Sequence, residues 1–276
     1  MKKPIVALMY DFDKTLCTKD MQEYGFIPSI GMEPAAFWSE VTKLTDSEQM
    51  DNILAYMYLM VEKSKEKKVR VSRETFKKSG EEVEFFDGVL TWFDRINRYA
   101  EEVGVRVEHY IVSSGIKEII EGTPIAKEFK KIYACEFMYD YNGVIQWPKY
   151  AVNYTAKTQF LFRINKGVLT IDSSSANKLN KFTPENERRI PFRNMIYVGD
   201  GLTDVPCMKL VKANGGQSIA VYDPEKGNEG AKSLLAANRV NFVVPAEYGP
   251  GSDIETIVKA IIKKIQAVAE LNSHVE

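Results

Sequence analysis

The sequence has few cysteines, no long hydrophobic run and almost no net charge. Its 276 residues include three cysteines, and this odd number, without metal-type or redox-motif spacing, argues against a disulfide framework. No apolar stretch approaches the roughly 18 residues that a membrane span requires. The formal net charge of -1 provides no large basic field for nucleic acid and no polybasic face for a membrane. We therefore expect no nucleic-acid or membrane partner, and a small molecule as the ligand.

Two local features could instead indicate a signal peptide or an anionic partner. Lys2 and Lys3 precede a short apolar run, as in a signal peptide, but the run stops at Asp11 and no small-residue cleavage site follows. The basic stretch 63–70 could touch anionic lipid or RNA, although a solvated helix end and loop explains it more simply. We therefore expect a cytoplasmic protein, either a monomer or a homodimer.

The composition of 45% hydrophobic and 27% charged residues is that of a globular chain, long enough for one large α/β core and a smaller insert. The core begins with an apolar run, 5–10, which predicts a buried strand of a parallel sheet. This run ends in Asp11 and Asp13, and Thr15 follows. Because ligands of open α/β sheets bind outside the carboxyl ends of the strands, these acids are placed at a candidate active site.

Two later apolar runs also end in polar motifs. The run 107–112 is followed by Ser-Ser-Gly, and the run 195–198 is followed by Gly-Asp-Gly-Leu-Thr-Asp, with a lysine-containing helix predicted between them. The candidate residues in these motifs are Ser113, Ser114, Gly115, Lys157, Asp200 and Asp204. Together with Asp-x-Asp-x-Thr, these ordered motifs resemble those of the haloacid dehalogenase-like hydrolases. The helical stretch that follows the first strand resembles the type 1 cap of the phosphoserine phosphatase branch.

The resemblance implies an α/β fold, a three-layer Rossmann-like parallel sheet core with a small helical cap of type 1 inserted after the first strand. We predict that the core comprises 1–16 and 86–276, and that the cap is 17–85, where apolar residues recur at helical spacing. Within the cap, Asp46 and Gln49 resemble a capping box at a helix start. The polar segment 167–194 is longer than the matching connection in the phosphoserine phosphatases, and the resemblance lapses there.

The motif residues suit phosphate transfer. A phosphate monoester is dianionic, so a carboxylate nucleophile can approach it only where cations cancel the repulsion. Asp11 and Asp200 supply hard oxygen ligands that suit Mg²⁺. Lys157, the Ser113 hydroxyl and amides near Ser114 would hold the phosphoryl oxygens in the transition state. Gly115 would let the backbone turn close to the anion, although the two serines could instead simply cap the next helix.

By resemblance, Asp11 is the nucleophile that becomes an aspartyl phosphate, and the main-chain carbonyl of Asp13 is a metal ligand. The Asp13 side chain would protonate the leaving alkoxide and later deprotonate water, which requires a raised pKa. Thr15 would orient Asp13. Asp204 would position Lys157 or a metal-bound water, or serve only as a helix N-terminal acid. The predicted metal set is Asp11, Asp13, Asp200 and Asp204. Lys149 and Lys166 are rivals of Lys157.

We therefore expect a magnesium-dependent phosphatase that hydrolyses a small phosphomonoester. A phosphotransferase that uses the same intermediate remains open, and the intact motifs disfavour a binding or regulatory module without turnover. A transport ATPase shares the Asp-Lys-Thr string, but here Asp13 precedes Lys14 and no membrane segment is present.

The substrate is expected to differ from phosphoserine. Asp20 stands where the branch places a glutamate that pairs with the substrate amine. The second predicted cap helix, 52–64, contains no arginine for a substrate carboxylate, and Thr203 replaces an asparagine of the branch. A sugar, nucleotide or cofactor phosphate is the preferred hypothesis. The arm 146–150 could border the active-site mouth or pack under the cap, and the sequence favours neither.

Overall fold

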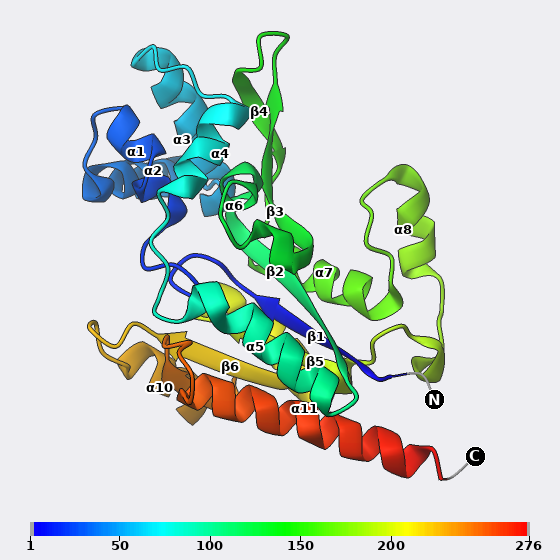
Figure 1. Cartoon of the computed structure of the whole chain (residues 1–276). Helices are drawn as coiled ribbons and strands as arrows, with labels where there is room; N and C mark the ends of the chain where they lie inside the picture. Colours follow the sequence, from blue (N-terminus) through cyan, green and yellow to red (C-terminus); the bar gives the residue numbers. More distant parts are fainter. Residues whose placement is uncertain (1–2, 275–276) are drawn as a thin grey trace.

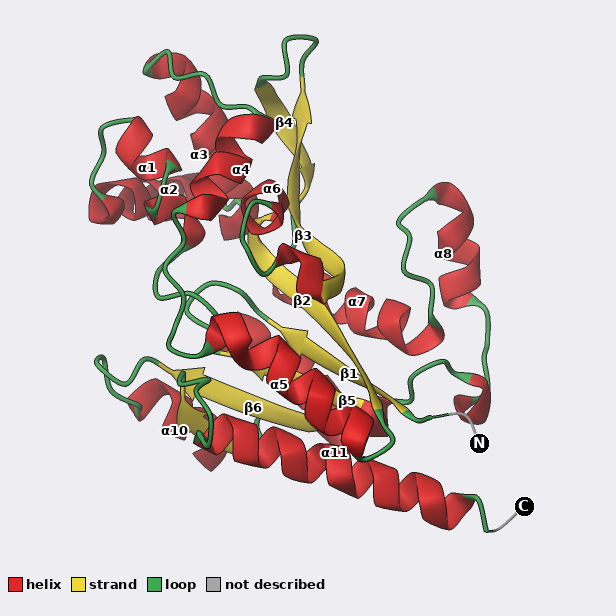
Figure 2. Ribbon diagram, in the orientation of Figure 1, coloured by secondary structure: helices red, strands yellow, loops and turns green. Residues whose placement is uncertain are grey.

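The computed structural model describes residues 3–274, which are built around a seven-stranded sheet (Figures 1 and 2). The strands lie in the order β4-β3-β2-β1-β5-β6-β7, and all neighbouring pairs are parallel except β3 and β4. Their bounds are β1 (Ile5–Tyr10), β2 (Arg106–Ile116), β3 (Phe129–Tyr139), β4 (Ile145–Tyr150), β5 (Met195–Gly199), β6 (Gln217–Tyr222) and β7 (Phe242–Pro245). The predicted α/β fold with a Rossmann-like parallel sheet is confirmed.

Helices cover both faces of this sheet and complete its three layers. Their bounds are α1 (Phe26–Ser29), α2 (Pro34–Glu48), α3 (Asn52–Glu66), α4 (Arg73–Glu81), α5 (Val89–Glu102), α6 (Lys117–Glu121), α7 (Tyr154–Lys166), α8 (Ser173–Asn180), α9 (Val205–Ala213), α10 (Glu229–Ala236) and α11 (Asp253–Asn272). Helices α5 and α11 pack together on the face that is in front in Figure 1, and α7 packs with α9 on the other. Helix α11 is the long amphipathic helix that the carboxyl-terminal sequence pattern predicts.

Strand β1 is the centre of the sheet. Residues Val6 to Tyr10 are fully buried because β2 and β5 pair with β1 on its two sides. In this register Tyr10 lies beside Ile111 of β2 and Val198 of β5, so the carboxyl ends of three parallel strands meet at one edge. The residues that follow these strand ends are therefore brought together, as the sequence predicts.

Strand β2 is longer than its apolar run predicts. It continues through the Ser-Ser-Gly motif to Ile116, where a register shift between Val112 and Ile116 keeps it paired with Cys135 of β3. Helix α6 begins only at Lys117, and no side chain caps it. The alternative in which Ser113 and Ser114 merely cap this helix is therefore wrong, because both serines still belong to the strand.

Helices α1 to α4, here called the helical group, lie beside the β3–β4 hairpin above the carboxyl edge of the sheet (Figure 1). The predicted capping box at Asp46 is wrong, because α2 continues to Glu48. The cap of α3 is Asp51, whose Oδ1 accepts hydrogen bonds from the amides of Ile53 and Leu54, both at 3.0 Å. A carboxylate at this position stabilises the free amides and the positive end of the helix.

The hairpin arm packs on the helical group. Ile145 N donates to Val71 O at 3.0 Å, and the ring of Trp147 lies edge-on to Tyr58 with centroids 6.3 Å apart. A large pocket lies at the carboxyl edge of the sheet and is described with the candidate active site below. None of the described residues that line it comes from the arm 146–150. Of the two alternatives for the arm, the structure therefore supports packing.

The segment 167–194 contains α8, which stands away from the sheet in Figure 1. Within residues 3–274, no helix combines the length and the apolar character needed to cross a bilayer.

Candidate active site

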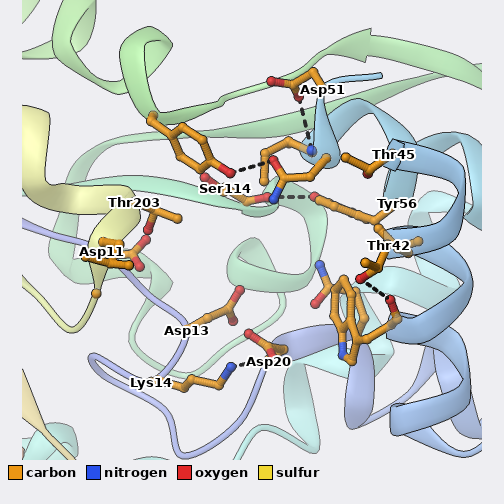
Figure 3. Close-up of a pocket in the computed structure, with 18 of the residues that line it drawn as sticks. Asp11, Asp13, Lys14, Asp20, Thr42, Thr45, Asp51, Tyr56, Ser114 and Thr203 are labelled. Atoms are coloured by element: carbon orange, nitrogen blue, oxygen red, sulfur yellow. Dashed lines mark hydrogen bonds and ion pairs between the residues drawn. The ribbon is translucent and has the colours of Figure 1, made fainter. Parts of the chain in front are cut away.

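The loop after β1 presents two carboxylates to the edge of the sheet. Asp11 N still donates to Val198 O of β5 at 2.9 Å, and the chain then turns sharply, because Phe12 O accepts hydrogen bonds from Thr15 N and Leu16 N. Lys14 adopts a left-handed backbone with φ of 55° at this turn. Asp11 and Asp13 both line a pocket of about 740 Å³ between the sheet edge and the helical group (Figure 3).

A buried lysine joins two of the acids. Lys157 Nζ lies 2.9 Å from Asp11 Oδ1 and 2.7 Å from Asp204 Oδ1. It stands in the first turn of α7, which Asn153 caps by accepting from Ala156 N at 3.0 Å. Burial alone would lower the pKa of Lys157, but the charges of Asp11 and Asp204 hold it well above its usual range. Lys157 is therefore a fixed cation beside the proposed nucleophile.

The rivals of this lysine lie elsewhere. Lys149 Nζ pairs with Glu136 at 3.0 Å, and Lys166 Nζ donates to the carbonyls of Leu179 and Lys181, each at 2.7 Å. The structure thus places Lys157 at the acids, as the motif order predicts.

Three carboxylates form a cluster that could hold a metal ion. Ligand oxygens of Asp11, Asp200 and Asp204 lie within 4.8 Å of one another. Burial, followed by the charge of Asp204, raises the pKa of Asp11 to about 6, and burial with the neighbouring acids also raises the pKa of Asp200. Among the described residues, Lys157 is the one cation that forms ion pairs with these three acids, and Asp204 Oδ2 is buried without a hydrogen-bond donor. The hard oxygen donors and the uncompensated charge fit Mg²⁺.

Asp204 is held by a contact that the sequence analysis missed. Tyr197 OH, from β5, donates to Asp204 Oδ1 at 2.7 Å, and both side chains are fully buried. A Cβ at Gly199 would lie 2.5 Å from Asp204 Oδ2, so this glycine makes room for the acid. The continuous apolar run of β5 gave no sign that one of its residues contacts the acid.

Asp13 is partly buried against the 3₁₀ turn Met21–Glu23, which precedes the helical group. Its Oδ1 accepts a hydrogen bond from Met21 N at 2.9 Å. Burial, followed by the charges of Asp20 and Asp11, raises the pKa of Asp13 well above its usual value. Thr15 Oγ1 is buried without a partner among the described residues, and the Asp13 carboxyl is held instead by Met21 N and, at 3.8 Å, by Cys17 Sγ.

The Ser-Ser-Gly motif lies beside these acids. Ser113 is fully buried, and its Oγ accepts from Gly115 N at 2.9 Å. Ser114 Oγ is already used, because it donates to Val152 O at 2.7 Å. A Cβ at Gly115 would lie 2.1 Å from Met21 Cε and 3.0 Å from Asp13 Oδ2. Gly115 is therefore required by the close approach of Met21 and Asp13.

The far side of the pocket is formed by residues that the sequence motifs did not indicate. The polar and aromatic side chains among them are Gln22, from the 3₁₀ turn Met21–Glu23, and Trp38, Thr42, Thr45, Asp51, Asn52, Tyr56 and Tyr154, from the helical group and the start of α7. Val41, Met50 and Ile53 add apolar surface. Asp20, which the sequence analysis did single out, also lines the pocket and pairs with Lys14 at 2.6 Å. Only the N-cap pattern at Asp51 could have drawn attention to this wall from the sequence.

Comparisons with known proteins agree with this geometry. A family model described as haloacid dehalogenase-like hydrolase matches residues 8–209. A protein of Borreliella burgdorferi described as uncharacterized is 30% identical over 284 residues, which cover 92% of this chain and 95% of that protein.

Two solved structures share the fold. A substrate-bound phosphoserine phosphatase complex has 14% identity and a TM-score of 0.57, with 94% of this chain and 99% of that chain covered. A phosphoserine phosphohydrolase-like protein from Francisella tularensis has 18% identity and a TM-score of 0.52, with 88% and 95% covered. Because the family model spans more than half of the sequence and includes the first motif, Lys157 and the Gly-Asp-Gly motif, this chain belongs to the haloacid dehalogenase-like hydrolase family.

Proposed function

We propose that this hydrolase is a magnesium-dependent phosphatase that acts on a small phosphomonoester through an aspartyl phosphate on Asp11. The observation that carries the proposal is the position of Lys157, buried between Asp11 and Asp204 and beside the pocket. A fixed cation next to a carboxylate nucleophile is what attack on a dianionic phosphate requires. The fold shared with a phosphoserine phosphatase supports the proposal.

In the first step, an Asp11 carboxylate oxygen attacks phosphorus and the bond to the leaving alcohol breaks. Asp13 gives its proton to the departing oxygen, and its raised pKa supports a carboxyl that is protonated before the reaction. In the second step, water attacks the aspartyl phosphate, returns a proton to Asp13 and releases inorganic phosphate. Lys157 and Ser113 would hold the phosphoryl oxygens in both steps.

Asp11, Asp200 and Asp204 would hold Mg²⁺, together with the Asp13 carbonyl. The ion would supply charge neutralisation for the phosphoryl group. We also propose that the segment 17–85, which includes the helical group, is a cap that encloses the substrate, because its residues line the pocket opposite Asp11.

The test is hydrolysis of p-nitrophenyl phosphate by the purified protein. We expect activity with Mg²⁺, loss in excess chelator, and turnover near background for Asp11→Asn and Asp13→Asn with folding retained. Asp94→Asn, an exposed position on α5, is the matched control and should keep wild-type activity. Substantial magnesium-supported activity in Asp11→Asn would overturn the mechanism. Transfer of phosphate to an added alcohol, measured in the same assay, separates a phosphotransferase from a phosphatase.

A further inference from the structure

The pocket beyond the phosphate position has almost no positive charge to offer a substrate. Among the described residues that line it, Lys14 is the one cation, and its ammonium lies 2.6 Å from Asp20 Oδ2. Figure 3 shows the Lys14 side chain directed toward Asp20. Lys157 is fully buried and is engaged by Asp11 and Asp204. A carboxylate or a second phosphate on the leaving group would therefore find no free cation in this wall.

Several neutral donors of the wall are also occupied. The two donors from aromatic side chains of the helical group go to protein acceptors: Trp38 Nε1 donates to Glu23 Oε1 at 3.2 Å, and Tyr56 OH donates to Ser114 O at 2.6 Å. A substrate acid would have to break these bonds or remain poorly paired, and a buried charge without partners is costly.

Two further hydroxyl donors, those of Thr42 and Tyr154, are used in the same way. Thr42 Oγ1 donates to Trp38 O at 3.0 Å, and Tyr154 OH donates to Asn52 Oδ1 at 2.8 Å. The wall consequently presents its aromatic faces and its acceptors, and few free donors, to a ligand.

Two polar atoms of the wall lack partners. Gln22 is only 2% exposed, and its Oε1 has no hydrogen-bond donor among the described residues. Thr45 Oγ1 is also buried without a hydrogen-bond partner among the described residues. Since buried polar atoms are nearly always paired in native proteins, a ligand that brings N–H or O–H donors is the natural complement of Gln22. The carboxylates of Asp20 and Asp51 add acceptors to the same wall.

We propose that the substrate is a phosphomonoester whose leaving group carries hydroxyl or ammonium donors and no carboxylate or further phosphate. This inference rests on the proposed phosphatase function and specifies its substrate class. Gln22 is then a specificity-determining residue, which accepts a hydrogen bond from the leaving group.

The experiment compares substrates that differ by one acid group. Phosphoethanolamine is phosphoserine without its carboxylate, and glycerol 3-phosphate carries a hydroxymethyl group where 3-phosphoglycerate carries a carboxylate. We expect kcat/KM to be at least tenfold higher for the member without the carboxylate in both pairs. A preference in the amine pair alone supports an ammonium as the donor, and one in the glycerol pair alone supports hydroxyls. Equal or higher kcat/KM for the carboxylate member in both pairs overturns the inference.

Three variants, one of them a control, test which residues cause the preference. Thr45→Arg would add a cation to the wall and should raise kcat/KM for phosphoserine and 3-phosphoglycerate at least tenfold relative to their partners, whereas Thr45→Gln adds length without charge and should keep the discrimination. Gln22→Leu keeps the approximate size but removes the acceptor, and we expect a rise in KM for the preferred substrates. An unchanged KM in Gln22→Leu would show that Gln22 does not accept a hydrogen bond from the leaving group.

The results distinguish a wrong substrate class from a wrong phosphatase function. Hydrolysis of p-nitrophenyl phosphate with a preference for the carboxylate substrates would overturn only the substrate class. No magnesium-dependent hydrolysis of any of these esters, in a folded protein, would overturn the phosphatase function and the substrate class together.

Discussion

Asn153 Nδ2 donates to Asp51 Oδ2 at 2.9 Å and thereby connects the N-caps of two helices that belong to different parts of the fold. Asn153 caps α7, which carries Lys157, and Asp51 caps α3 of the helical group. The neighbouring pair Tyr154 and Asn52 adds a second bond of 2.8 Å. The position of Lys157 is therefore coupled to the position of the helical group.

The first prediction concerns this coupling. Asn153→Ala removes the cap of α7 and the bond to Asp51, so we expect the free energy of unfolding to fall by about 1–2 kcal/mol. We also expect a lower kcat, because the first turn of α7 loosens around Lys157. Denaturant unfolding and phosphatase kinetics measure the two effects. Asn153→Ser keeps a capping oxygen but is too short to reach Asp51, so a kcat that stays at the wild-type value in both variants would contradict the coupling.

The second prediction concerns the metal. If Asp11, Asp200 and Asp204 hold Mg²⁺ in the folded state only, Mg²⁺ at 100 times its dissociation constant should stabilise the protein by about 2.7 kcal/mol. We expect the thermal midpoint to rise with Mg²⁺, to return after chelation, and to respond far less in Asp200→Asn. Asp94→Asn should respond like the wild type. This measurement needs no substrate. A wild-type thermal midpoint that does not change with Mg²⁺ would exclude a resident ion.

The third prediction concerns a buried histidine away from the pocket. Trp92 Nε1 donates to Tyr10 OH at 2.7 Å, and His109 Nδ1, at 3.0 Å, is the acceptor within reach of the Tyr10 hydrogen. We therefore assign the remaining imidazole hydrogen to His109 Nε2, which lies 3.0 Å from Asn97 Oδ1. The imidazole is thus held neutral. Burial lowers the pKa of His109 to about 3.

The consequence is a loss of stability in acid. The unfolded chain takes up a proton at His109 near pH 6.5, and the folded chain does not until about pH 3. The stabilisation is therefore complete above pH 6.5 and falls as pH decreases, by up to about 1.4 kcal/mol per pH unit. Urea unfolding of the wild type and of His109→Gln at several pH values between 7.5 and 5 should give a steeper decline for the wild type. Parallel curves would show that folding does not lower the pKa of His109.

The fourth prediction concerns the segment 167–194. Arg189 donates to both carboxylate oxygens of Glu108 in β2, at 2.7 and 2.5 Å, and Lys130 donates to the same carboxylate at 2.6 Å. Although burial opposes it, these contacts hold the pKa of Glu108 far below its usual range. Arg189 is thus an anchor for a segment that contributes none of the described pocket-lining residues.

Removal of the anchor should affect the segment and leave the chemistry unchanged. For Arg189→Met, we expect the free energy of unfolding to fall by about 1.5–3 kcal/mol, because hydrogen bonds to a charged group are lost while Lys130 still compensates Glu108. Limited proteolysis should cut faster within 167–188, and kcat/KM should not change. A large drop in kcat/KM with normal stability would give the segment a role in catalysis.

The sequence predicted the sheet edge well because each part of that prediction depends on local pattern. Apolar runs that end in Asp11, Ser113 or Asp200 indicate strand ends, and parallel strands necessarily bring these ends together. Lys157 could be chosen over its rivals because of motif order, and the structure then shows why it alone reaches the acids.

The pocket wall opposite Asp11 could not be predicted in this way. Gln22, Asp51 and Tyr154 belong to three separate segments, and only tertiary packing makes them neighbours around one pocket. The continuation of β2 through Ser113 was also missed, because the register shift that permits it depends on the pairing with β3. The misplaced cap at Asp46 shows the same limit, since Asp46 and Asp51 both have the chemistry of a cap.

The contact between the helical group and the β3–β4 hairpin has a consequence for protein engineering. Val71 O accepts a backbone hydrogen bond from Ile145 N, and Tyr58 packs on Trp147. The segment 17–85 is therefore attached to the hairpin at 145–147, which lies far along the chain from both ends of the segment. A chimaera that exchanges only 17–85 with a relative would leave half of this interface mismatched. Successful grafting of a new specificity should require that the hairpin be transferred with the helices, and natural recombination within the family would be constrained to inherit the two segments as a pair.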